Sequence, residues 1–220
     1  MELLKKEVYI TGADKDPAVS EFVDEINVLK NKHQLELDKQ KTAFLIIDMQ
    51  NFFFDRNSHA FVPSAPNIIK RIMSIRERCS KLNIPVIYTR HVNTPEDAGQ
   101  MGRWWKDFIT PGSRMSEIIE ELIEPEMQIL EKSQYNAFFK TDLEQILRRN
   151  NITQLIISGV MTNLCCETTA REAYVRDFDV FFGIDFTASY NRKFHSSTLC
   201  NLAYGFALPL MASEILERLS

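Results

Sequence analysis

The sequence predicts an α/β fold of three layers, in which a mostly parallel, six-stranded sheet lies between two layers of helices. Short apolar runs of strand length alternate with helical patterns along most of the chain. This order is typical of a parallel sheet whose crossover helices cover both faces. The run at residues 41–47 is almost continuously apolar, as expected of a strand buried on both sides. With 220 residues, 45% of them hydrophobic, the chain can form one sizeable core.

Local patterns place the elements in chain order. We divide the chain into an N-terminal extension, residues 1–40, and one domain, residues 41–220. The extension holds a predicted helix over residues 20–32. The predicted strands cover residues 41–47, 84–89, 128–131, 154–158, 179–184 and 206–211. The other predicted helices cover residues 63–83, 116–123, 141–149, 167–176, 194–204 and 212–219. The helix at 141–149 begins with a capping-box pattern, TDLE at residues 141–144. The long polar segment 93–112 is typical of a binding loop.

Composition and charge exclude several classes of function. A net charge of −4 gives no basis for nucleic acid binding. No apolar run approaches the roughly 20 residues of a membrane span, and the N-terminal residues lack the apolar core of a signal peptide. The four cysteines show no C-x-x-C spacing. We therefore expect a cytoplasmic protein with free thiols, without a nucleic acid or membrane partner and without a cofactor.

A cysteine follows the fourth predicted strand. The stretch at residues 159–172 connects the strand at 154–158 through a tight turn to the helix at 167–176, and Thr162 or Asn163 can cap that helix. Cys165 then falls in the first helical turn, where the helix dipole and free N–H groups lower a thiol pKa. This position suits a nucleophile.

A carboxylate and a lysine follow two other predicted strands. Asp48 comes directly after the first strand and Lys132 directly after the third. Ligands of parallel sheets bind beyond the carboxyl ends of the strands, so we expect both side chains to lie near Cys165. A carboxylate can take the thiol proton, a lysine offsets negative charge, and backbone N–H groups can bind an oxyanion. From local sequence alone, Asp48 suits a turn or a helix cap equally well.

Three motifs resemble the isochorismatase-like family of cysteine hydrolases, which includes nicotinamidases, N-carbamoylsarcosine amidohydrolases and ureidoacrylate hydrolases. The motifs are IIDMQ at residues 46–50, EK with YNAF within residues 131–138, and GVMTNLC leading to TTAREA within residues 159–173. Each motif alone is weak, whereas all three in this order at strand ends are specific. They cover the body of the chain, from about residue 41 to its end.

The resemblance implies a catalytic triad of Asp48, Lys132 and Cys165. It also implies a cis peptide bond between Val160 and Met161, with the backbone N–H groups of Met161 and Cys165 directed at the oxyanion. A homo-oligomer, either a dimer or a tetramer, is expected on the same grounds.

Cys166 competes with Cys165 for the role of nucleophile. The family spacing Thr-Asn-x-Cys favours Cys165, and helix geometry turns the next residue about 100° away. We therefore expect Cys166 to pack against the sheet. Cys79 and Cys200 are expected within helices.

Candidates for substrate contacts follow from their positions after strand ends and from the family resemblance. They are Asn51, Phe53, His91, Trp104, Trp105, Tyr135 and Phe138. Tyr135 and Phe138 suit the core equally well, and the two tryptophans suit a cover of the core or an oligomer contact equally well. Asp185 suits a helix cap better than the site.

The nicotinamidase branch holds a metal through an aspartate and histidines. Asp55, His59 and His91 lie in the corresponding regions, but their spacing does not match, so we expect no metal. True isochorismatases act on a vinyl ether and lack the cysteine. The presence of Cys165 therefore favours hydrolysis of a C–N bond in a small amide or carbamoyl compound, with water as the second substrate. The alternatives are an ether hydrolase and a non-catalytic binding protein on the same fold.

Overall fold

The computed structural model describes residues 5–13, 16–30, 35–105 and 107–220. Within these ranges the strands form one sheet in the order β3-β2-β1-β4-β5-β6, with every neighbouring pair parallel. The strands are β1 (Thr42–Ile47), β2 (Val86–His91), β3 (Gln128–Lys132), β4 (Gln154–Val160), β5 (Asp179–Ala188) and β6 (Leu208–Leu210). The predicted α/β class and the six strands are confirmed.

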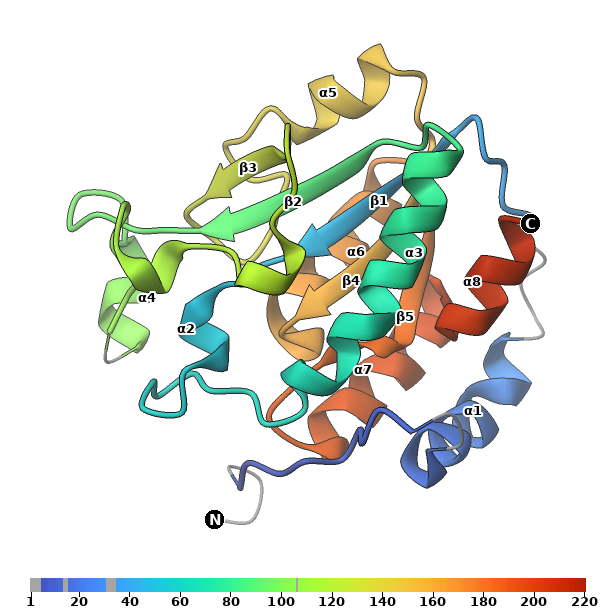
Figure 1. The fold of residues 1–220 in the computed structure, drawn as a ribbon, viewed down its shortest axis with the longest axis horizontal. Helices are drawn as coiled ribbons and strands as arrows, with labels where there is room; N and C mark the ends of the chain where they lie inside the picture. Colours follow the sequence, from blue (N-terminus) through green and yellow to red (C-terminus); the bar gives the residue numbers. More distant parts are fainter. Residues whose placement is uncertain (1–4, 14–15, 31–34, 106) are drawn as a thin grey trace.

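Helices cover both faces of the sheet. The α-helices are α1 (Pro17–Lys30), α2 (Asn51–Phe54), α3 (Ile69–Lys81), α4 (Gly99–Trp104), α5 (Leu143–Arg149), α6 (Glu167–Val175), α7 (Arg192–Gly205) and α8 (Ala212–Arg218). Helix α3 packs against α8, and α7 packs against both α6 and α1. Figure 1 shows α3 in front of the sheet and α6 behind it. None of the helices in the described ranges is long and apolar enough to cross a bilayer.

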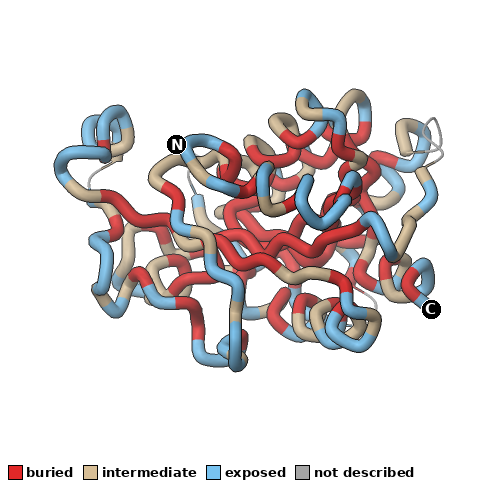
Figure 2. Tube along the Cα trace, turned by 90° about the horizontal axis from the view of Figure 1, so that it is seen from above, coloured by how far each residue is buried: buried red, intermediate tan, exposed pale blue. Residues whose placement is uncertain are grey.

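The core lies between these layers. Every residue of β1 and β4 is buried, which explains their mainly apolar sequences. Helix α3 buries Ile72, Ile75 and Cys79 at helical spacing. Figure 2 shows the buried segments running through the middle of the molecule between more exposed outer segments.

Several predicted boundaries differ from the structure. The expected helix at residues 116–123 is absent; this part forms two short 3₁₀ turns, η3 (Arg114–Ser116) and η4 (Glu120–Leu122). Between them, Ile118 forms an antiparallel bridge with Gln50, so tertiary pairing replaces the local helical pattern. The predicted loop 93–112 instead contains α4. The last predicted residues of the first helix, 31–32, lie outside the described residues.

The capping box at residues 141–144 was also wrong in detail. Helix α5 begins at Leu143, with Asp142 as the residue that precedes it and without a side-chain cap. The Thr141 hydroxyl donates to the Ala137 carbonyl at 2.5 Å and still accepts the N–H of Leu143, the first helical residue, at 3.3 Å.

The carboxyl ends of the strands meet at one edge, where α2 and α4 lie (Figure 1). A close backbone approach helps to bring β4 and β1 together there. Gly159 has φ +105, and a Cβ at this position would lie 2.0 Å from the Ile47 carbonyl oxygen. Only glycine fits such a contact. The cysteine-bearing turn therefore leaves the sheet directly beside the end of β1.

Candidate active site

Asp48 is the first residue after β1 and is fully buried. Its φ of +48 is uncommon for a residue with a side chain. Thr89, on the neighbouring strand β2, donates its hydroxyl to Asp48 Oδ1 at 2.6 Å and accepts the Asp48 backbone N–H at 3.1 Å. This pair of bonds fixes the carboxylate and leaves Oδ2 directed at Lys132.

Lys132 ends β3 and brings its ammonium group to the same point. Its Nζ lies 2.7 Å from Asp48 Oδ2, and both side chains are fully buried. The group also donates to the Gln134 carbonyl at 2.9 Å and to Cys165 Sγ at 3.5 Å. Burial by itself would lower the pKa of Lys132, but the charge of Asp48, the interaction with Cys165 and the hydrogen bonds to both side chains together outweigh it, and the net shift is upward. The lysine is therefore held as a cation.

His91, the last residue of β2, completes the polar cluster. Asn93 donates its side-chain N–H groups to the Ser133 carbonyl at 3.0 Å and to Asp97 at 3.2 Å, so its Oδ1 faces His91 Nε2 at 2.8 Å. Nε2 must then carry the proton, and Nδ1 offers its lone pair to Lys132 Nζ at 3.3 Å. Burial, and then the charge of Lys132, lower the pKa of His91 to about 4.

The turn after β4 carries the cysteine. The peptide bond between Val160 and Met161 is cis, as the family resemblance implied. A π-helical turn, η5 (Thr162–Cys166), follows and leads into α6. Cys165 thus lies in the π turn and not in the first turn of a regular α-helix, which corrects the expectation from sequence. Leu164 and Cys166 donate their N–H groups to the Met161 carbonyl, and neither bond uses the N–H group of Cys165.

Burial raises the pKa of the Cys165 thiol, and the charge of Lys132 only partly opposes this. The sequence had predicted a lowered pKa from the helix start. The difference arises because Cys165 is only 5% exposed, and removal from water disfavours a thiolate more than the turn stabilises it. At rest the group is a thiol, so its use as a nucleophile requires a base.

Cys166 points away from this cluster. It is fully buried, and its thiol lies 3.7 Å from the Ser158 carbonyl of β4. The expectation that it packs against the sheet is confirmed. Asp185, which is also buried, accepts from the Ala212 N–H at the start of α8 and pairs with Arg71, so it serves a helix start and not the cluster.

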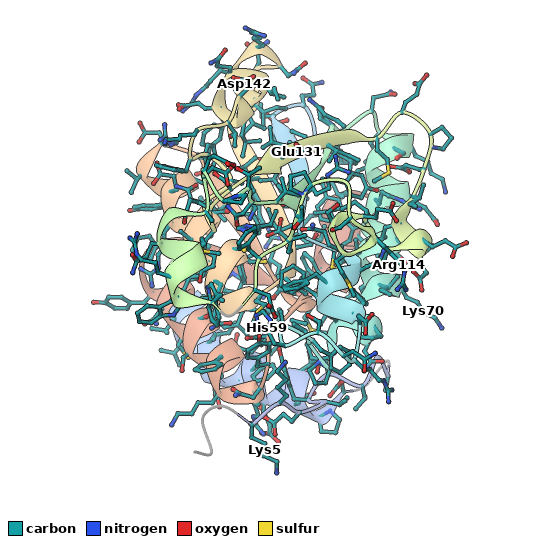
Figure 3. All side chains as sticks on the ribbon, turned by 90° about the vertical axis from the view of Figure 1, so that its left-hand side faces the viewer. Lys5, His59, Lys70, Arg114, Glu131 and Asp142 are labelled. Carbon is teal, nitrogen blue, oxygen red and sulfur yellow. The ribbon has the colours of Figure 1, made fainter. Side chains whose placement is uncertain are left out.

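A cavity opens above Cys165 at the carboxyl edge of the sheet, the edge that faces the viewer in Figure 3. Its walls are mainly apolar and aromatic. The lining residues predicted from sequence are Phe53, His91, Trp105, Tyr135, Met161 and Cys165. Trp105 Nε1 donates to the Tyr135 hydroxyl at 2.6 Å, which joins two of the walls.

Three predicted substrate contacts lie outside this cavity. Asn51 turns its amide to the Arg114 carbonyl at 2.9 Å. Trp104 is 71% exposed because it lies on the outer side of α4. Phe138 is buried and packs on Phe178, with ring centroids 5.8 Å apart. In each case the position after a strand end is correct, but the side chain points elsewhere.

Sequence reasoning missed other walls and a support of the site. Thr89 binds Asp48 from mid-strand, where a threonine carries no distinctive signal. The missed walls come from several distant segments; they are Phe52, His59, Ala60, Asn93, Met101, Asp107, Phe108, Ile109, Leu164 and Tyr190. His59 stands among them with its Nδ1 at 3.2 Å from Asp107 and its ring stacked on Trp105.

The donor groups of the cluster do not suit a metal ion. Side-chain atoms of Asp48, His91 and Cys165 lie within 4.8 Å of one another, close enough to share an ion. However, the Lys132 ammonium contacts all three of these side chains and so takes the place of a cation. Asp55 and His59 are directed to Arg114 and Asp107 instead, and they do not join His91.

Comparisons with known proteins identify relatives of this chain. A family model, described as the isochorismatase domain, matches residues 42–214. The chain is 42% identical over 170 residues to nicotinamidase 3 of Arabidopsis thaliana, covering 75% of this chain and 82% of that protein.

Two solved structures share the fold. A cysteine hydrolase from Pseudomonas syringae pv. phaseolicola 1448A aligns with a TM-score of 0.81 and 25% identity, covering 84% of this chain and 95% of that one. An N-carbamoylsarcosine amidase from Thermoplasma acidophilum aligns with a TM-score of 0.68 and 25% identity, covering 78% and 96%.

Proposed function

The chain belongs to the isochorismatase family of hydrolases, and on that premise we propose that it hydrolyses a C–N bond in a small amide or carbamoyl compound through a thioester on Cys165. The observation that carries this proposal is the buried contact of Lys132 with both Asp48, at 2.7 Å, and Cys165, at 3.5 Å, at the base of the aromatic cavity.

The first half of the proposed reaction forms the thioester. Cys165 Sγ attacks the amide carbonyl carbon while Asp48 takes the thiol proton. The carbonyl oxygen becomes an oxyanion, which the backbone N–H groups of Met161 and Cys165 bind; one such donor is worth about 3 kcal/mol. Asp48 then gives its proton to the leaving nitrogen, the C–N bond breaks, and ammonia or an amine departs.

The second half releases the acid. Water attacks the thioester carbonyl, Asp48 accepts a proton from the water, and the C–S bond breaks. The thiol regains that proton, so the site returns to its starting state. Lys132 stays protonated throughout and holds the carboxylate beside the sulfur. His91 orients the ammonium through its Nδ1 lone pair.

The shape and chemistry of the cavity favour a small planar substrate. Aromatic rings of Phe52, Trp105, Tyr135 and Tyr190 line it, and such rings bind flat ligands by stacking and edge contacts. The first substrates to test are nicotinamide, after the nicotinamidase of Arabidopsis thaliana, and N-carbamoylsarcosine, after the amidase of Thermoplasma acidophilum. We also propose self-association as a dimer or tetramer on family grounds.

The test measures ammonia release from a panel of small amides and carbamoyl compounds. We expect turnover of at least one planar amide by the natural chain, and a loss of about 1,000-fold or more in kcat/KM for Cys165→Ala. Intact-protein mass spectrometry after rapid acid quench should detect the acyl group on Cys165.

Cys166→Ala is the matched control, because it removes a buried thiol from the same turn. It should retain activity within about an order of magnitude, since the Cys166 thiol faces the Ser158 carbonyl and not the cavity. Turnover of a vinyl ether that survives Cys165→Ala would instead support the ether hydrolase. Inactivity on the whole panel, together with a Cys165 that resists thiol-reactive amides, would support a binding protein.

A further inference from the structure

The N-terminal segment 5–10 lies outside the family match, which begins at residue 42. It nevertheless runs along the edge of the cavity. Lys6 Nζ donates to the His59 backbone carbonyl at 2.6 Å and lies 4.3 Å from the centroid of the Tyr190 ring. Both His59 and Tyr190 line the cavity above Cys165. Lys6, which lies outside the family match, thus contacts two residues of the cavity wall without lining the cavity itself.

The same carbonyl also joins the two walls directly. The Tyr190 hydroxyl donates to the His59 carbonyl at 3.3 Å, so this oxygen accepts from both Tyr190 and Lys6. The His59 ring stacks on Trp105 at 6.4 Å and meets Phe52 edge-on at 5.4 Å. A shift of the His59 backbone would therefore move a ring that contacts two further walls.

The position of Lys6 is fixed by its neighbours. The Glu7 N–H donates to the Tyr190 carbonyl at 2.9 Å, and Glu7 Oε1 accepts from the Arg192 N–H at 2.9 Å. Further along, the N–H groups of Tyr9 and Ile10 both donate to Ser64 Oγ, at 3.0 and 3.2 Å. These bonds set the register of the segment, so the contact between Lys6 and His59 is part of an ordered arrangement.

We propose that Lys6 is a positioning residue for the substrate cavity: it holds the walls formed by His59 and Tyr190 in the arrangement that binds the substrate. The proposal rests on the proposed amide hydrolysis for its kinetic test. Lys6 contacts neither the thiol nor its base. Its loss should weaken substrate binding and leave the chemical step nearly unchanged.

The experiment compares Lys6→Met with Lys5→Met. Lys5 is the matched control because it is the preceding residue and is exposed, and Figure 3 shows its side chain extending outward at the border of the molecule, away from His59. We expect Lys6→Met to raise KM for the best amide by about fivefold to twentyfold with kcat within about twofold of the natural chain. Lys5→Met should change neither value.

Lys6→Arg should restore most of the lost affinity, since a guanidinium can donate to the same carbonyl and lie over the same ring. Equal KM values for Lys6→Met and Lys5→Met would overturn the proposal. So would a fall in kcat as large as the rise in KM, because that result indicates general disruption of the site.

Hydrogen exchange gives a readout that needs no substrate. Lys6→Met should speed amide exchange in the peptide that covers residues 55–62, and Lys5→Met should not. Unchanged exchange in that peptide refutes the positioning role even if no amide is hydrolysed. If instead the natural chain is inactive while Lys6→Met still loosens residues 55–62, the proposed reaction fails and the positioning role stands.

Discussion

The buried pair between Asp48 and Lys132 gives the sharpest test of the site. Its atoms lie 2.7 Å apart, and both side chains are fully buried. Lys132→Met keeps the length of the side chain but removes the charge. Asp48 then remains as a buried carboxylate with the Thr89 hydroxyl and without its cation. Breaking such a pair from one side costs about 3–5 kcal/mol, because the remaining charge has lost both water and its partner.

That loss is a large part of the 5–15 kcal/mol that is typical of a folded protein. For a urea m-value of about 3 kcal/mol/M, a loss of that size lowers the unfolding midpoint by roughly 1–1.7 M. Far-ultraviolet circular dichroism during urea titration measures the shift. The double variant Lys132→Met/Asp48→Asn removes both charges and should regain most of the lost stability, since no unpaired charge remains buried.

Activity separates the two effects. The single and the double variant should both be inactive towards the amide, although only the single variant is strongly destabilised. A loss below about 1 kcal/mol for Lys132→Met, or a double variant as unstable as the single one, would refute the electrostatic reasoning. Appreciable turnover by the double variant would refute the proposed roles of Asp48 and Lys132.

Two further predictions concern the fold. Gly159→Ala should abolish soluble expression or lower the free energy of unfolding by about 4 kcal/mol or more, because its Cβ would lie 2.0 Å from the Ile47 carbonyl oxygen; a near-native urea midpoint would contradict this. Burial lowers the pKa of both His91 and His195 to about 4. The unfolded chain therefore binds more protons between about pH 4 and 6.5, and the free energy of unfolding should fall by up to about 3 kcal/mol per histidine as the pH decreases through that window. Urea titrations at a series of pH values measure the slope, which should diminish in His195→Gln; a flat profile would contradict the assignment.

The sheet and the cluster at its edge were predictable because each depends on a strong local signal. The run at residues 41–47 is almost continuously apolar, and the expected strand was found at Thr42–Ile47. Asp48 directly follows β1, and Lys132 is the last residue of β3. Because both strands are parallel members of one sheet, the topology brings the two residues to the same edge. No other long-range information was needed to expect that Asp48, Lys132 and Cys165 lie together.

The parts that sequence did not predict depend on contacts between distant segments. The predicted helix at residues 116–123 is replaced by 3₁₀ turns, because Gln50 pairs with Ile118 and its side-chain amide donates to the Ser116 carbonyl. His59 and Tyr190, which both line the cavity, are 131 residues apart in sequence, and the Tyr190 hydroxyl donates to the His59 backbone carbonyl. The raised pKa of the Cys165 thiol depends on burial, which a helix-start pattern does not encode.

Burial of the thiol also constrains the proposed chemistry. A permanent thiolate at Cys165 would place a second anion beside Asp48 and a single cation, Lys132, among buried groups. Transfer of the thiol proton to Asp48 avoids this, because one anion disappears as the other forms. The cluster then holds one cation and one anion before and after the transfer. The raised pKa of Cys165 is thus compatible with nucleophilic attack, provided that the proton moves to Asp48 in the same step as the sulfur attacks.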